Sequence, residues 1–342
     1  MDIICLESEW YKNLKLLQWP ENSIKIYKYF LADSTKKQYN QYLESFQNFC
    51  LKKCKCFPPD NIHLSALVAE FITEKSKYSD RPESLLRGIM SALTNYFNIP
   101  GRFNPISQEL KNLVKAIIKY GTVKQAGRTK VMPIQPFINM FKIWGSNESL
   151  PLMRLRQKTI TLMVIACLAR PSDFAPKIGF FRDQIEFHSD GSATVRFFGV
   201  KNDSDRAGFE TRIEPTLDEI SDPIKCIKMF FSKTAHIPPN NNGRIPAFPA
   251  LKSPFNCISA QTIAQILNDS IAEAGLDTHT FSAKCFRPSA ATATIVSGCD
   301  PNTTRVRGRW KNDQVFYSNY VYPISQINVS DSIMTSNVKL YD

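Results

Sequence analysis

The chain has 342 residues, of which 43% are hydrophobic and 11% aromatic, and it carries a net charge of +12. This composition supports substantial cores in two domains of ordinary size and excludes an intrinsically disordered protein. The excess of cations indicates a polyanionic partner, with nucleic acid as the first candidate and an acidic membrane surface as the second. No apolar run approaches the roughly 18 residues of a membrane-spanning helix, so we expect no membrane span.

The N-terminus and the cysteines bear on the cellular compartment. The first ten residues, MDIICLESEW, carry acids where a secretion signal has cations, so we expect no such signal. The nine cysteines form no small disulfide-rich module, which favours a reducing cytosolic or nuclear compartment. Cys50, Cys54, Cys56 and His63 lack the paired spacings of zinc sites, so we expect a helix end there and no metal.

Apolar residues recur at helical spacing through the first 120 residues. One stripe runs from Tyr39 to Phe49, with Ser34 or Thr35 as its candidate cap, and a second runs over 64–72. A third helix is expected after Asp80, and a fourth over 110–118. Residues 1–120 are therefore predicted to form a helical N-terminal domain.

A run of cations without an acid follows within residues 111–130. Its members are Lys111, Lys115, Lys119, Lys124, Arg128 and Lys130. The first three repeat every four residues, on the polar face of the fourth helix. A solvated basic face is the alternative explanation, but a position between two folded regions favours a segment that tracks a phosphate backbone. We predict a basic linker at 121–133 and DNA contacts by these six cations.

From residue 134 the pattern changes to that of a second, larger domain, predicted over 134–325. The segment RQKTITLMVIACLAR is nearly all apolar and is predicted to be a buried helix that delivers Arg170 at its end. Three short strand-like runs and three helices follow, at 183–187, 193–200, 209–215, 223–235, 259–274 and 284–297. The fold class is therefore mainly α with one small antiparallel sheet, followed by a tail at 326–342.

Several kinds of catalytic site lack their signature in this sequence. There is no G-x-x-x-x-G-K-[ST] loop and no G-x-G-x-x-G, and glycine totals only 13, so a nucleotide-binding cradle is not expected. No compact carboxylate cluster suggests a two-metal nuclease. We expect neither a metal nor another cofactor.

Isolated cations instead stand at conspicuous points of the second domain. They are Arg170 three residues before Asp173, Lys201 at a hairpin tip, Lys284 three residues before Arg287, and Arg309 within Gly-Arg-Trp at 308–310. Three tyrosines follow, at 317, 320 and 322. This order resembles the catalytic domain of tyrosine recombinases, and the preceding helices, opening with STKKQYNQYLESFQNFC, are similar to their core-binding domain. The resemblance spans about residues 30 to 325, and the forms GRW and FRPSAAT are most similar to eukaryotic mobile-element recombinases such as those of Cryptons.

The residue types suit transfer of a phosphodiester to a phenol. Charge that builds on the non-bridging oxygens is bound by paired guanidiniums, which stay charged at any relevant pH. Neighbouring positive charge helps a tyrosine to ionise, and a mobile lysine can protonate the leaving 5′-oxygen. Since the bond energy is kept in a phosphotyrosyl linkage, neither ATP nor Mg²⁺ is required.

The resemblance implies a role for each residue. Arg170 and Arg287 form the phosphate clamp, Lys201 is the general acid, and Lys284 stands where the family most often has histidine. Asp173 supports Arg170. Trp310 takes a second position often held by histidine, with a packing role as the alternative, and Arg309 is the alternative occupant of that position. Tyr320, ten residues after Trp310 where nine is usual, is the expected nucleophile, with Tyr317 and Tyr322 as alternatives.

The function that the resemblance implies is site-specific recombination or integration of double-stranded DNA through a 3′-phosphotyrosyl intermediate. It further implies a tetramer of this chain on two DNA sites and a nuclear location in a eukaryote, or otherwise a cytoplasmic one with the DNA. Two alternatives stay open. One is a domesticated, catalytically inactive DNA-binding protein, and the other is a type IB topoisomerase. The tail either docks onto a neighbouring protomer or frays.

Overall fold

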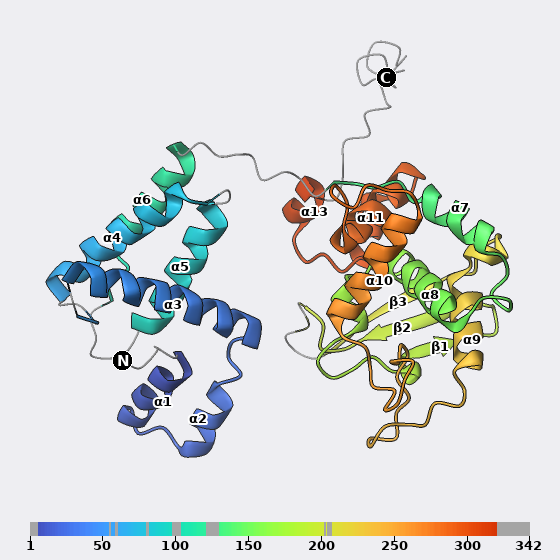
Figure 1. The fold of residues 1–342 in the computed structure, drawn as a ribbon, viewed down its shortest axis with the longest axis horizontal. Coiled ribbons are helices and arrows are strands. Elements are labelled where there is room, and N and C mark those ends of the chain that lie inside the picture. Colours follow the sequence, from blue (N-terminus) through green and yellow to red (C-terminus); the bar gives the residue numbers. More distant parts are fainter. Residues whose placement is uncertain are drawn as a thin grey trace, which may run out of the picture. The chain divides into compact units, whose positions relative to one another are not determined.

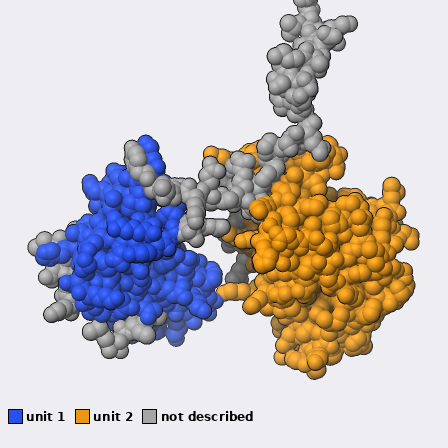
Figure 2. Space-filling view, turned by 45° about the horizontal axis from the view of Figure 1, so that its top comes forward, with its two compact units in different colours: residues 1–127 blue, residues 128–342 orange. Residues whose placement is uncertain are grey.

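The computed structural model describes residues 6–54, 56–58, 61–79, 82–97, 104–120, 130–201, 203 and 207–319. The chain divides into two compact units, residues 1–127 and 128–342 (Figure 2). The predicted linker, 121–133, spans this division, and its residues 121–129 lie outside the described part. The predicted tail, 326–342, lies outside it as well.

Within its described residues, the first unit contains helices joined by turns and irregular segments, and no strand (Figure 1). Its helices are α1 (Leu6–Leu16), α2 (Glu21–Tyr27), α3 (Asp33–Cys54), α4 (Asn61–Lys77), α5 (Pro82–Phe97) and α6 (Gln108–Tyr120). The core lies among α3, α4 and α5, where Phe46, Phe71 and Leu93 are fully buried. These residues come from the apolar stripes that predicted the helices, because a helix that buries one face repeats its apolar positions every three to four residues.

The start of α3 corrects one expectation. The backbone N–H of Lys36 donates to the carbonyl of Ala32 at 3.0 Å, so the helix begins at Asp33. Ser34 and Thr35 therefore lie within the first turn and do not cap it, because the chain turns helical before it reaches them. The predicted start of α5 is closer, since Pro82 is its first residue and Glu83 follows in its first turn.

The second unit surrounds a three-stranded antiparallel sheet. Its helices are α7 (Gln135–Trp144), α8 (Leu152–Ala166), α9 (Pro223–Lys233), α10 (Ala260–Glu273), α11 (Phe286–Val296), α12 (Pro301–Arg307) and α13 (Asp313–Asn319). The 3-10 turns are η1 (Pro171–Phe174), η2 (Arg182–Gln184), η3 (Glu219–Ser221) and η4 (Ala283–Cys285). The strands β1 (Ile185–Phe187), β2 (Ala193–Phe197) and β3 (Phe209–Ile213) pair in the order β1-β2-β3.

The sheet alternates buried and exposed positions, as a half-buried sheet requires. In the central strand Val195 faces the core and pairs with Ile185 on one side and Thr211 on the other. The helix α9 packs beside β1, where the rings of Phe231 and Phe187 lie 6.3 Å apart (Figure 1). The predicted fold class, mainly α with one small antiparallel sheet, is confirmed. No helix among the described residues is long and apolar enough to cross a bilayer.

Two predicted helices of the second unit differ from the observed ones. The buried helix α8 begins at Leu152 and ends at Ala166, so Arg170 lies beyond it in extended backbone. The segment predicted as one helix over 284–297 starts as the 3-10 turn η4 and becomes α11 only at Phe286. Lys284 and Arg287 therefore do not share a face of one helix, since Lys284 is exposed in the turn while Arg287 is buried.

Candidate active site

The way in which α8 ends determines the position of Arg170. Leu168 has a left-handed backbone (φ +47°), its N–H donates to the Ile165 carbonyl, and the Ala169 N–H donates to the Val164 carbonyl. These two bonds form the Schellman motif, which ends a helix and turns the chain away sharply. Arg170 follows in extended backbone (φ −81°, ψ 152°), with 26% of its side chain exposed.

Asp173 binds the backbone of Arg170 and the side chain of Arg309. Its Oδ2 accepts the Arg170 backbone N–H at 2.9 Å and the Nη2 of Arg309 at 2.9 Å, while the Arg170 guanidinium lies 4.0 Å from Oδ1. The Asp173 side chain is 1% exposed and that of Arg309 is 5% exposed. Asp173 thus supports Arg170 as expected, but its direct charge partner is Arg309.

Arg309 is the left-handed residue of a second Schellman motif, which ends α12. Its N–H donates to the Val306 carbonyl and the Trp310 N–H donates to the Arg305 carbonyl, with Arg309 itself at φ +64°. The Nη1 of Arg309 donates to the Thr211 hydroxyl at 3.1 Å. Its guanidinium also stacks 4.4 Å from the ring centre of Phe197. Arg309 is therefore a buried, multiply bonded cation, and the alternative that it takes the exposed histidine-like position at the phosphate loses support.

Arg287 is fixed by the same Gly-Arg-Trp segment. Its Nη2 donates to the Gly308 carbonyl, and its guanidinium lies 4.2 Å from the Trp310 ring centre. Arg287 is 3% exposed and Trp310 6%. A guanidinium carries five N–H donors in one plane, so one bond to a carbonyl and a stacked ring fix its orientation.

Gly308 is required by the close approach of the Trp310 ring. A Cβ at this position would lie 1.8 Å from Cζ3 of Trp310, far inside contact distance. The indole packs 4.8 Å from the Phe316 ring and joins a small buried cluster with Leu168, Ala290 and Ala291. Trp310 therefore has the buried, packed surroundings of its alternative role, and its ring also lies against the Arg287 guanidinium.

The cluster that these contacts define is strongly positive. It holds the guanidiniums of Arg170, Arg287 and Arg309 against the single carboxylate of Asp173. Cys167 lies close behind, and burial raises the pKa of its thiol to about 12 although Arg309 opposes that shift. Cys167 therefore stays protonated at neutral pH and is not a nucleophile. Charge of this sign suits an anionic ligand such as a phosphate.

Two predicted site residues lie outside this set of contacts. Lys201 is exposed in the turn after β2, four residues beyond Phe197, and Lys284 is exposed in η4, three residues before Arg287. Within the described part of the chain, neither lysine takes part in the bonds that join the cluster. Each is nevertheless attached through a short stretch of backbone to a residue that does.

Of the three candidate tyrosines, only Tyr317 lies within the described residues. Tyr317 lies in α13 with 48% of its surface exposed, and its ring is 5.3 Å from that of Phe316. Since Phe316 packs on Trp310, α13 is anchored beside the cluster. Tyr320 and Tyr322 lie outside the described residues, so the expected nucleophile is not placed.

Half of the predicted DNA-binding cations lie on α6 of the first unit. Lys111, Lys115 and Lys119 are exposed on one side of the helix, while Leu110 and Val114 are buried on the other. Lys111 and Lys115 line a groove of about 650 Å³, which α5 also borders with Arg87, Ser91, Thr94 and Asn95. Lys130 is exposed at the start of the second unit. Lys124 and Arg128 lie outside the described residues.

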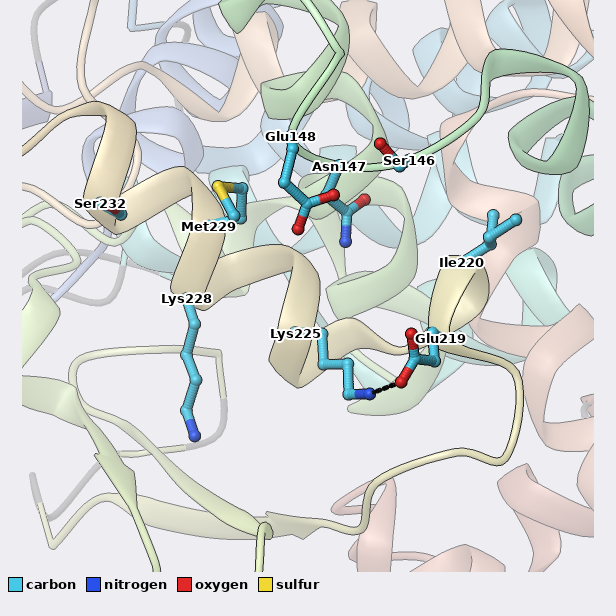
Figure 3. A pocket seen from close by; sticks show the side chains of 9 residues that line it. All are labelled: Ser146, Asn147, Glu148, Glu219, Ile220, Lys225, Lys228, Met229 and Ser232. Carbon is cyan, nitrogen blue, oxygen red and sulfur yellow. Dashed lines mark hydrogen bonds and ion pairs between the residues drawn. The ribbon is translucent and has the colours of Figure 1, made fainter.

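Another cavity of the second unit holds none of the predicted site residues. It has a volume of about 450 Å³ and lies between the turn after α7 and the helices η3 and α9 (Figure 3). Lys225 and Glu219 form an ion pair within it. Among the described residues, no group of three or more histidine, cysteine, aspartate or glutamate side chains is placed to hold a metal ion.

Known proteins match this chain in fold. No family model and no curated protein matches its sequence. The integrase of transposon Tn1549, solved in complex with transposon right end DNA, has a TM-score of 0.57 at 12% identity, covering 97% of this chain and 99% of that one. A lambda integrase dimer bound to a COC′ core site gives 0.54 at 13%, covering 94% and 97%. XerH recombinase bound to its difH substrate gives 0.56 at 11%, covering 81% and 74%. The chain has the fold of these recombinases and integrases.

Proposed function

We propose that this chain is a tyrosine-type DNA strand transferase, a site-specific recombinase or integrase that cuts and rejoins duplex DNA. The observation that carries the proposal is the joining of Arg170, Arg287, Arg309 and Asp173 through the Gly-Arg-Trp segment, in the fold shared with recombinases and integrases. Three guanidiniums around one carboxylate make a site with an excess of positive charge, as a phosphodiester requires.

The proposed reaction is an in-line displacement at phosphorus. The phenol of Tyr320 loses its proton to solvent, helped by neighbouring positive charge, and the phenolate oxygen attacks the phosphorus. The bond from phosphorus to the 5′-oxygen breaks, leaving a 3′-phosphotyrosyl bond. Arg170 and Arg287 bind the non-bridging oxygens, whose charge grows in the transition state. Lys201, exposed on its turn, supplies a proton to the leaving 5′-oxygen.

The remaining site residues take supporting roles. Lys284, exposed in η4, contributes positive charge near the phosphate, and it lacks the imidazole with which a histidine at this place would act as a base. Trp310 holds Arg287 by stacking under its guanidinium. Rejoining is the reverse step, in which a 5′-hydroxyl attacks the phosphotyrosyl bond, so neither a metal nor ATP enters the scheme.

The partner proposed for the first unit is the DNA backbone. The lysines of α6, the groove beside them, and the basic residues up to Lys130 are assigned to phosphate contacts, which need no fixed base sequence. We further propose a tetramer of the chain at two DNA sites. The proposed location follows the DNA: the nucleus in a eukaryote, and otherwise the cytoplasm.

The test is covalent trapping on nicked DNA duplexes. The duplexes are built from the sequences that flank the gene of this chain. Each carries a nick beside the expected cleavage point, so that cleavage releases a short 5′-hydroxyl strand and its loss prevents rejoining. We expect a covalent protein–DNA adduct whose digestion yields a phosphotyrosyl peptide at Tyr320, identified by mass spectrometry. The adduct should persist in Tyr317→Phe and disappear in Tyr320→Phe.

The outcomes separate the competing functions. An adduct lost only in Tyr317→Phe would move the nucleophile to α13. Tight binding of the duplexes without any adduct would contradict strand transfer and favour a DNA-binding protein that has lost catalysis. Relaxation of any supercoiled plasmid without preference for a site would instead indicate a type IB topoisomerase.

A further inference from the structure

We propose that Arg309 is a positioning residue that holds the phosphate-binding arginines and the β2–β3 hairpin in one fixed arrangement. The inference rests on the function proposed above, and it gives a role to a residue that contacts none of the DNA in that scheme. Arg309 is suited to this role because its guanidinium is buried and bonded on several sides, whereas Arg170 stays partly exposed.

Each side-chain contact of Arg309 reaches a different element of the second unit. Its bond to Asp173 reaches η1, and the same Asp173 oxygen holds the backbone N–H of Arg170. Its bond to the Thr211 hydroxyl reaches β3, and its stack on Phe197 reaches the end of β2. Lys201 lies four residues after Phe197, so the strand that leads into its turn is in contact with the Arg309 guanidinium.

The backbone beside Arg309 completes the connection. Gly308, immediately before it, accepts the bond from Arg287, and Trp310, immediately after it, stacks under the same arginine. A displacement of Arg309 would therefore shift the supports of Arg170 and Arg287 together. Residues 173 and 309 are 136 positions apart in sequence, so this ion pair also joins two distant segments of the second unit, η1 and the end of α12.

The backbone conformation of Arg309 is energetically unfavourable for any residue other than glycine. It occupies the left-handed region at φ +64°, as Leu168 does at the end of α8, whereas the ends of α10 and α11 have Gly275 and Gly298 in that conformation. A residue with a side chain costs about 1 kcal/mol more than glycine there. The side-chain bonds to Asp173 and Thr211 offset that cost, and glycine would lose them.

The test compares two variants that differ in the charge left behind. Arg309→Met strands the buried Asp173 carboxylate, so it should lower both the folding stability and the rate of cleavage. The double variant Asp173→Asn, Arg309→Met removes both charges, and its asparagine oxygen still accepts the Arg170 N–H. We expect it to regain most of the stability, because no buried charge is left unpaired.

The decisive readout is the single-turnover rate of adduct formation on saturating nicked duplex, beside the Kd for the same duplex. With positioning lost, the rate of the double variant should stay about 100-fold below that of the parent, while the Kd changes less than about threefold. Recovery of the rate along with stability would overturn the proposal, because Arg309 would then be a structural ion-pair partner only. Arg307→Met is the matched control, since Arg307 pairs with Glu214 at the surface, and it should leave rate and Kd unchanged.

A second measurement does not depend on catalysis. Hydrogen exchange of the Arg170 and Asp173 backbone amides should quicken at least tenfold in the double variant and stay unchanged in Arg307→Met. Unchanged exchange in the double variant would also overturn the proposal. If the parent itself forms no adduct, strand transfer fails as the function, and the exchange experiment still decides whether Arg309 orders the site.

Discussion

Lys158 places a cation inside the core of the second unit without a strong partner. The residue lies in α8 and is 0% exposed, its Nζ is 3.5 Å from the Gly145 carbonyl, and the Phe141 ring centre is 5.8 Å away. Burial lowers the pKa of Lys158 below the ordinary value of 10.5, with Cys226, Asp218 and Glu148 opposing the shift. The folded state therefore binds this proton more weakly than the unfolded chain, which is a loss of stability.

Lys158→Met is expected to stabilise the protein at pH 7 by about 1–3 kcal/mol, because an apolar side chain of similar length replaces a buried charge. Below its folded-state pKa, Lys158 is protonated in both states and the full penalty applies. As the pH rises through that pKa toward 10.5, the folded state loses the proton first and the penalty fades. Urea unfolding at pH 7 and pH 10 should therefore show the advantage of the variant shrinking with pH. An advantage that grew with pH would contradict the assignment.

The control for this residue is Lys142→Met in the neighbouring α7. Lys142 is 53% exposed and pairs with Asp218 at 3.3 Å. Exposed ion pairs contribute little, so the variant should change the free energy of unfolding by less than about 0.5 kcal/mol. A comparable gain in both variants would point to a general effect of lower net charge instead of burial.

Two helix ends shape the site, and neither carries the usual sequence signal. The helices α8 and α12 end in Schellman motifs whose left-handed residues are Leu168 and Arg309, where glycine is the common choice. At Leu168 the backbone strain is offset by burial, since the side chain is 2% exposed and packs with Trp310 and Phe316. Burial of a leucine contributes about 1.5–3 kcal/mol, which exceeds the roughly 1 kcal/mol cost of the left-handed backbone.

Substitutions at Leu168 should reverse the ordinary order of alanine and glycine. Both Leu168→Ala and Leu168→Gly lose the buried side chain, but only glycine also relieves the backbone. We expect Leu168→Gly to be the more stable of the two by about 1 kcal/mol. At Leu162, buried inside the same helix, Gly should instead be the less stable by about 1 kcal/mol. Urea unfolding of all four variants tests this. The same order at both positions would contradict the role given to the strained helix end.

These ends also mark where the sequence stopped being informative. The stripe of α6 and the alternation of β2 follow from local periodicity, so the helix and the strand were predictable. The end of α8 was placed four residues late, because Leu168 shows no glycine signal. Arg309 was considered only for a phosphate contact, because its partner Asp173 is 136 residues away and no local pattern joins them. The flanking Gly308, which leaves room for Trp310, was the one local sign of a crowded site.

At the scale of the whole molecule, charge is divided unevenly along the chain. Residues 1–130 hold 20 basic and 12 acidic residues, and the remainder holds 23 and 19. The first unit with its adjoining basic segment is thus the more positive part, while the second unit is nearer to charge balance and places three of its cations, Arg170, Arg287 and Arg309, around Asp173. This division suits a DNA-binding protein in which one part contributes affinity and the other chemistry, because phosphate contacts are made wherever cations face the backbone.

The charge of the first unit makes a prediction about salt. Each lysine that neutralises a phosphate releases counterions, so the logarithm of affinity falls with the logarithm of salt concentration by about 0.9 per contact. Lys111→Gln and Lys115→Gln should each reduce that slope by about 0.9, and the double variant by about twice as much. Fluorescence anisotropy with a duplex of arbitrary sequence, from about 50 to 200 mM salt, measures it. Lys77→Gln is the control, because Lys77 is exposed in the same unit but does not line the groove beside α6, and its slope should match the parent.

A parent affinity that stays flat over this range, or a double variant with the parent slope, would show that α6 does not follow the phosphate backbone. The lysine stripe would then be a solvated helix face, and the DNA contacts would have to come from other parts of the chain.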